Sequence, residues 1–192
     1  DSLDINGWDL RKALNLFRKS NPPLLEWLQS PIQYEEKYSV AEKLRGISPH
    51  TFSPKSCMYH YLNMAKGNYR DYLQGEQVKI KKYFYVLRPV LACEWINRYE
   101  EMAPMAFDVL VDRLIPKDGE LWEAVQQLLS RKKAGEELDY EPRLAPINNY
   151  LEERFAMLDK AAASLSATDD KRDDQLDALF REALQEVWGL TL

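Results

Sequence analysis

Two short apolar segments separated by a pair of prolines most constrain the fold of this chain. The first segment, from about residue 8 to residue 19, repeats its apolar side chains at helical spacing. Asn21-Pro22-Pro23 must end that helix, because a residue that precedes proline is driven out of the helical region. Residues 24–28 then form a second, shorter apolar helix. This part of the chain is therefore predicted to be a helix, a sharp corner and a helix.

Apolar periodicity predicts helices along most of the remaining chain as well. They are expected at residues 36–44, 55–73, 79–99, 105–114, 119–133, 142–164 and 174–188. The helix at 79–99 is apolar nearly all round, so it should lie at the centre of the core, with a kink at Pro89. Only residues 2–5 alternate as a strand does. The predicted fold class is mainly α, a helical bundle with a residual strand at the N-terminus.

Composition narrows the class of protein. The chain has 192 residues, of which 45% are hydrophobic and 30% charged, as in soluble globular proteins. No window approaches the roughly 18 uninterrupted apolar residues of a membrane span, and residues 1–4 do not resemble a signal peptide. Cys57 and Cys93 lack metal-binding spacing, so reduced thiols in a cytoplasmic protein are expected.

Charge is distributed unevenly. The net charge of −5 argues against a protein that simply coats nucleic acid, but binding follows the local field. Residues 55–88 hold seven basic and two acidic side chains, a local charge of +5. This segment therefore predicts one positive surface that binds an anionic ligand.

Three side chains of the 79–99 helix form the first candidate site. Lys81, Tyr85 and Arg88 are spaced i, i+4, i+7 and share a face, while Lys82 lies about a hundred degrees round. In a mostly apolar helix we expect these cations to be at least half buried, and buried charge needs a partner. A bound triphosphate would provide one, and internal acids such as Glu26 or Glu94 are the alternative.

Two further groups of polar side chains are weaker candidates. His60 and Asn63 share a helical row that could face the base or the acceptor of a nucleotide reaction, although a single histidine is more often structural. Arg11, beside Lys12, could contact phosphate, or it could belong to the solvated face of an amphipathic helix.

The helix-corner segments, Gly7-Trp8-Asp9-Leu10-Arg11-Lys12-Ala13-Leu14 and Lys19-Ser20-Asn21-Pro22-Pro23-Leu24-Leu25-Glu26-Trp27-Leu28, carry a family resemblance. Together with Tyr83-Phe84-Tyr85-Val86-Leu87-Arg88-Pro89 they resemble the predicted nucleotidyltransferases of the DNA polymerase β superfamily, in the subgroup associated with RNA repair. The resemblance covers residues 4–115. It implies Mg²⁺-dependent transfer of a nucleoside monophosphate from an NTP to a hydroxyl, such as an RNA end, with release of pyrophosphate. Comparable enzymes use a lysine of the helical domain against the phosphates, which favours Lys81.

The catalytic motifs of that family are not in this sequence. The family holds its nucleotide on a Gly-Ser turn, and its metal ions on an Asp-x-Asp pair and a third carboxylate from a later strand. Neither motif occurs here, and Asp4 falls where the third carboxylate would, which makes it the candidate catalytic and metal-binding residue. A surface role is the alternative for Asp4, and Asp1 is a weaker candidate.

We therefore expect the C-terminal portion of a nucleotidyltransferase from a truncated α+β domain, and whether this chain alone is an enzyme stays open. Residues 1–34 would be the remnant of the catalytic domain, 35–165 a helical domain, and 166–192 a polar break with a C-terminal amphipathic helix. The alternatives are a non-catalytic helical module that binds nucleotide, RNA or a partner, and a regulator that binds nucleotide without turnover.

Overall fold

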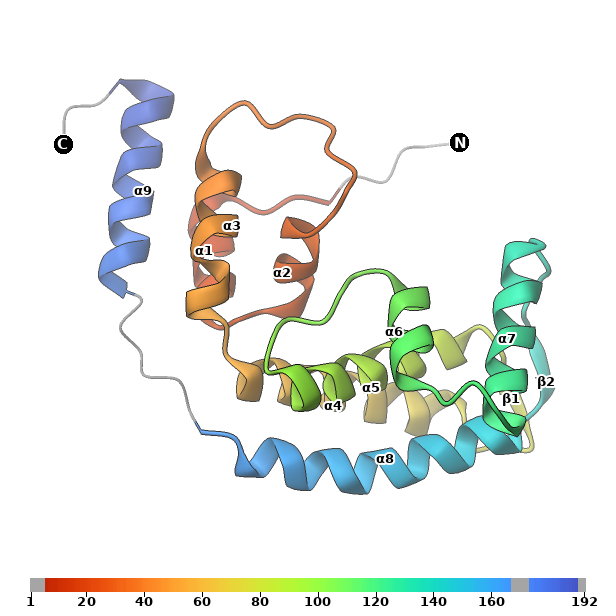
Figure 1. The fold of residues 1–192 in the computed structure, drawn as a ribbon. Helices are drawn as coiled ribbons and strands as arrows, with labels where there is room; N and C mark the ends of the chain where they lie inside the picture. Colours follow the sequence, from red (N-terminus) through yellow and green to blue (C-terminus); the bar gives the residue numbers. More distant parts are fainter. Residues whose placement is uncertain (1–5, 167–172, 190–192) are drawn as a thin grey trace.

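The computed structural model describes residues 6–166 and 173–189, and helices dominate this part of the chain (Figure 1). The helices are α1 (Leu10–Arg18), α2 (Pro22–Leu28), α3 (Val40–Thr51), α4 (Pro54–Tyr72), α5 (Lys82–Tyr99), α6 (Phe107–Leu114), α7 (Glu120–Lys133), α8 (Ala145–Ser164) and α9 (Asp173–Trp188). The strands β1 (Gln77–Lys79) and β2 (Tyr140–Pro142) form a small antiparallel pair. The mainly α class is thus confirmed.

The corner between α1 and α2 forms where the prolines predict it. Ser20 adopts a left-handed backbone conformation, with φ of 50°, and turns the chain after α1. The Asn21 side chain then accepts a hydrogen bond from the backbone N–H of Leu24 (3.3 Å) and caps α2. The Ser20 hydroxyl also accepts the backbone N–H of Ser53 (2.9 Å), which ties the corner to the start of α4. The corner therefore fixes α2 against the central helices.

Helix α5 lies at the centre of the core, as its apolar composition predicts. It packs along α4, and α6 and α8 cover other sides of it. Its fully buried side chains include Tyr83, Leu87 and Leu91. The helix continues through Pro89, and the kink expected there stays a prediction.

The start of α5 differs from the prediction. The sequence predicts the helix from residue 79, but Lys79 ends strand β1 and the helix begins only at Lys82. The register places Lys79 opposite Tyr140, and the backbone N–H groups of Ile80 and Lys81 donate to the carbonyls of Asp139 and Leu138. The partner strand lies about sixty residues further along the chain, so apolar periodicity could not reveal this pair.

Helix α3 is also misplaced in the prediction, which ended it before Gly46. The helix runs through Gly46 and Pro49. Leu44, Ile47 and Thr51 keep one face packed, while Gly46 is exposed, so burial of that face outweighs the poor helix propensity of glycine.

Helix α9 lies beside α1 and α3, while α8 runs along α4 and α5 (Figure 1). Leu176, Leu179 and Ala183 of α9 are buried. None of the described helices combines the length and apolar character needed to cross a membrane. The predicted strand at residues 2–5 and most of the polar break at 166–173 lie outside the described residues. The division into domains at residues 34 and 165 stays a prediction.

Candidate functional site: a cavity beside the start of helix α5

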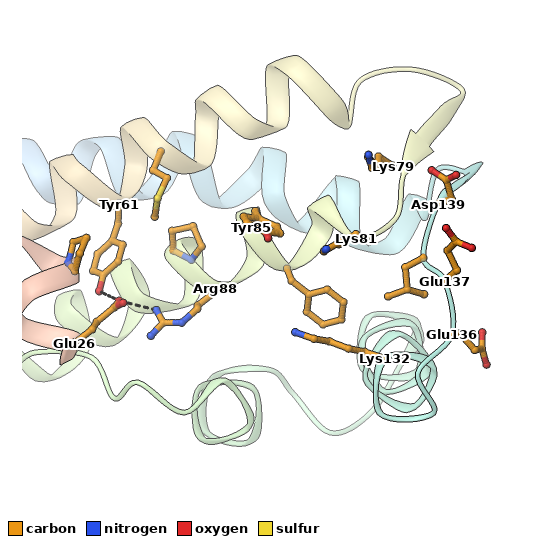
Figure 2. A pocket seen from close by; sticks show the side chains of 15 residues that line it. Glu26, Tyr61, Lys79, Lys81, Tyr85, Arg88, Lys132, Glu136, Glu137 and Asp139 are labelled. Carbon is orange, nitrogen blue, oxygen red and sulfur yellow. Dashed lines mark hydrogen bonds and ion pairs between the residues drawn. The ribbon is translucent and has the colours of Figure 1, made fainter. Parts of the chain in front are cut away.

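A cavity of about 710 Å³ lies between α2, α4, α5, α7 and the segment before β2 (Figure 2). Its apolar lining consists of Pro23, Tyr61, Met64, Phe84, Tyr85, Pro89 and Leu138. Its charged lining consists of Lys79, Lys81, Arg88 and Lys132 with Glu26, Glu136, Glu137 and Asp139. The cavity thus combines the apolar and aromatic walls typical of a ligand site with four basic and four acidic side chains.

One end of the cavity is closed by an internal ion pair. Arg88 Nη1 lies 2.9 Å from Glu26 Oε1, and Arg88 Nη2 donates to the backbone carbonyl of Met105 (3.1 Å). The Tyr61 hydroxyl donates to the same Glu26 oxygen (Figure 2). The Arg88 and Glu26 side chains are only 24% and 20% exposed. Burial, reinforced by the Glu26 carboxylate, raises the pKa of Tyr61 far above its ordinary value, so the hydroxyl stays a donor.

The other end of the cavity holds Lys81. Its backbone N–H donates to Leu138 O (3.3 Å), but its ammonium makes no ion pair or hydrogen bond with another described residue. Lys81 is exposed, so the predicted half-burial is wrong for it; it precedes the first turn of α5 instead of lying within the helix. The first turn of α5 also lacks an acidic residue and a capping side chain. The ammonium and the positive end of the helix dipole therefore both favour an anion here.

Two other lysines approach the cavity over aromatic rings. Lys132 of α7 lies 4.5 Å from the centre of the Phe84 ring, and Lys79 lies 6.0 Å from that of Tyr140. Neither Lys132 nor Phe84 is among the candidates predicted from the sequence. This contact joins residues of α5 and α7 that are distant in the chain, and no local pattern in the sequence indicates it.

The acidic wall of the cavity is partly neutralised. Arg131 Nε lies 2.8 Å from a Glu136 carboxylate oxygen, and the Arg131 Nη1 group donates to Glu141 (2.9 Å). Hydrogen bonds from Arg131 lower the pKa of Glu141 below its ordinary value. Across residues 6–166 and 173–189, no three His, Cys, Asp or Glu side chains are grouped so that they could hold a metal ion.

The structure brings together part of the predicted site. Lys81, Tyr85 and Arg88 all line the cavity, as their helical spacing predicts. For Arg88 the internal partner considered from the sequence is present, and it is Glu26. Lys82 does not line the cavity; its ammonium lies 4.8 Å from the centre of the Tyr85 ring, on the outer side.

The other predicted residues lie elsewhere. His60 and Asn63 are exposed on α4, and the cavity is lined instead by the neighbouring row of that helix. Arg11 is exposed on α1, at a separate shallow hollow that it shares with Asp9 and Lys12. Asp9 caps α1 by accepting the Lys12 backbone N–H (2.9 Å), as expected of an acid at a helix start. Asp4 lies outside the described residues, so its catalytic role stays a prediction.

Comparisons with known proteins support the resemblance seen in the sequence. Residues 1–182 match the family RlaP, described as the RNA repair pathway DNA polymerase beta family. The chain is 48% identical over 188 residues to the uncharacterized protein YcgL of Bacillus subtilis (strain 168). The aligned region covers 98% of this chain and 72% of that protein. No solved structure matches the chain. With nearly its whole length matched, the chain belongs to the RNA repair pathway DNA polymerase β family, RlaP.

Proposed function

We propose that the cavity binds the NTP of a nucleotidyl transfer reaction, in which a nucleoside monophosphate passes to a hydroxyl acceptor and pyrophosphate leaves. The observation that carries this proposal is Lys81, an ammonium without an ion-pair partner among the described residues, at the mouth of an aromatic-walled cavity. Membership of a DNA polymerase β-like family supports the reaction class.

The cavity provides for both parts of a nucleotide. The Tyr85 ring is 49% exposed and Phe84 is partly buried beside it, so these side chains can pack against a base. Lys81, Lys132 and the positive end of α5 would face the phosphates. Arg88 is paired with Glu26, so we assign it to holding the closed end of the cavity in place.

Transfer itself requires groups that this sequence does not contain. The acceptor oxygen must attack the α-phosphorus while the bond to pyrophosphate breaks, and both oxygens carry developing negative charge. The Gly-Ser turn and Asp-x-Asp pair that serve this chemistry in the family are absent from the 192 residues. The need for Mg²⁺ and the role of Asp4 stay predictions. We therefore expect this chain to bind NTP without transferring label from it to RNA.

Titration calorimetry with each of the four NTPs tests the proposal. Losing one charge-assisted contact costs about 1.5–3 kcal/mol, so Lys81→Met should weaken NTP binding roughly 10- to 150-fold with little change in melting temperature. Lys133→Met is the matched control, because Lys133 is exposed on α7 next to Lys132 but does not line the cavity.

Two results would contradict the proposal. The wild-type chain could fail to bind any of the four NTPs. Alternatively, Lys81→Met and Lys133→Met could weaken binding equally, which would show that the general field of the protein, rather than contact within the cavity, attracts the nucleotide.

A further inference from the structure

Three exposed tyrosines lie near the start of α5, and a lysine ammonium lies over the ring of each. Tyr72, Tyr85 and Tyr140 are 40%, 49% and 62% exposed. The Lys82 ammonium lies 4.1 Å from the ring centre of Tyr72 and 4.8 Å from that of Tyr85. Lys79 lies 6.0 Å from the ring centre of Tyr140. We call these five residues the tyrosine–lysine rim.

The rim continues from the cavity. Lys79 and Tyr85 belong to the cavity lining as well, and Tyr140 is the register partner of Lys79 in the β1–β2 pair. From Tyr85 the rim passes through Lys82 to Tyr72 at the end of α4. A chain-like ligand on the rim would therefore have one part beside Lys81.

The chemistry of the rim fits one class of ligand. Every nucleobase has a face that can stack on an exposed aromatic ring. Lys82 and Lys79 lie over the rings in the free protein, and their flexible side chains can turn away to contact the phosphates when bases take their place. A duplex keeps these faces within its own stack, so the rim favours an unpaired strand. An acidic peptide would use the lysines but would have little use for three exposed tyrosine faces.

Local charge supports the same ligand. The whole protein carries −5, which opposes binding of a polyanion over its general surface. The rim lies mainly within the segment 55–88, whose sequence carries +5. Lys66 and Arg88 of that segment are paired with Asp159 and Glu26, so the cations that the rim itself offers to a strand are Lys79 and Lys82.

We propose that the tyrosine–lysine rim binds a single-stranded nucleic acid and presents its end to the cavity that holds Lys81. The identification of this strand as the acceptor rests on the proposed function. Binding of the strand itself does not require an NTP.

Fluorescence anisotropy with a labelled twelve-nucleotide RNA and its blunt duplex tests the proposal. We expect tighter binding of the single strand. Since each base stacked on an aromatic ring contributes about 1–3 kcal/mol, Tyr72→Ala and Tyr85→Ala should each weaken binding about 5- to 150-fold. Tyr72→Phe and Tyr85→Phe keep the ring and should bind nearly as the wild type does.

Tyr59→Ala is the matched control. Tyr59 is 41% exposed on α4, close to the exposure of Tyr72, but it is not part of the rim. Circular dichroism establishes whether each variant is folded. If an Ala variant does not fold, the matching Phe variant still reports on stacking, because it keeps the ring.

The outcomes separate this inference from the proposed function. Strand binding that depends on Tyr72 and Tyr85 supports the rim even when no NTP binds, in which case only the proposed function fails. Three results would overturn the inference: equal affinity for the strand and the duplex, an equal loss of affinity with Tyr59→Ala, or no loss of affinity with either rim variant. NTP binding would still have its own test. Displacement of the strand by polyglutamate, without dependence on the tyrosines, would also overturn it, because charge alone would then explain binding.

Discussion

The two ends of the cavity hold cations from the same stretch of chain, one with an internal ion-pair partner and one without. Arg88 is partly buried and bonded to Glu26 and to a backbone carbonyl, whereas Lys81, seven residues earlier, is exposed and has no ion pair within the described residues. The α1–α2 corner brings Glu26 to the first end. The segment before β2 offers Lys81 only the Leu138 carbonyl, which its backbone uses. Helical spacing thus decides which side chains share a face, and the elements packed opposite decide which remain available for a ligand.

The largest expected effect that could break this comparison is on stability. Arg88→Met leaves the Glu26 carboxylate without its cation in a largely buried position, so we expect the free energy of unfolding to fall by about 2–3 kcal/mol. Lys81→Met should leave it unchanged within error. Urea denaturation of both variants and the wild type measures the difference. Equal destabilisation by the two changes would show that the ends are not distinct.

A smaller change sharpens the description of the closed end. Tyr61→Phe removes one hydrogen bond to Glu26 but leaves the Arg88 ion pair, so it should cost about 1 kcal/mol of unfolding free energy. Combined with Arg88→Met it should give a non-additive result, because both side chains bond the same carboxylate oxygen. Strict additivity in urea denaturation would argue against a shared network.

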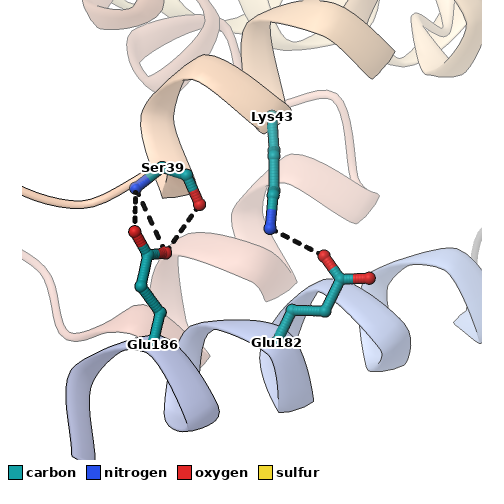
Figure 3. A network of polar contacts seen from close by, with 4 residues as sticks. All are labelled: Ser39, Lys43, Glu182 and Glu186. Carbon is teal, nitrogen blue, oxygen red and sulfur yellow. Dashed lines mark hydrogen bonds and ion pairs between the residues drawn. The ribbon is translucent and has the colours of Figure 1, made fainter.

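The smallest expected effect is on exposed charged groups. These lie at the contact between α3 and α9 (Figure 3). The backbone N–H of Ser39 and its hydroxyl donate to the Glu186 carboxylate at 3.0 and 2.6 Å. These bonds lower the pKa of Glu186. A carboxyl group whose pKa is lowered by folding stabilises the protein at pH values above its pKa in the unfolded chain, about 4.3. That stability is lost as the pH falls through the pKa of the group in the folded protein.

Acid should therefore loosen α9. Hydrogen exchange of residues 173–189, corrected for intrinsic rates, should speed up in this pH range, and Glu186→Gln should reduce the dependence. The nearby Lys43–Glu182 pair (2.7 Å) raises the pKa of Lys43, and that contribution to stability is lost as pH rises through the folded value. If protection of α9 against hydrogen exchange is the same in the wild type and in Glu186→Gln across the acid range, this assignment is contradicted.

Sequence reasoning succeeded where local rules decide the structure. The proline corner ends α1 and begins α2, and the all-round apolar pattern places α5 in the core. It failed where distant residues decide. The β1–β2 pair, which shortens α5 and leaves Lys81 outside it, joins segments far apart in the chain.

The candidate site shows the same division. Lys81, Tyr85 and Arg88 do share the cavity, with Tyr85 and Arg88 on one face of α5 and Lys81 at its N-cap position. On α4, however, the sequence could not tell which polar or aromatic row faces the cavity, and Tyr61 and Met64 line it rather than His60 and Asn63. Lys132 could not be found from its own surroundings, because its position beside Phe84 depends on how α7, which packs against α8, is placed in the fold.

The bond between Ser39 and Glu186 joins residues 147 positions apart. Glu186 accepts from the backbone N–H of Ser39, the N-cap residue of α3, whose own side chain makes no capping bond to the helix. During synthesis on the ribosome, α3 emerges long before Glu186, so the bond at its start can form only once α9 is present. Loss of α9 would therefore be felt at the start of α3.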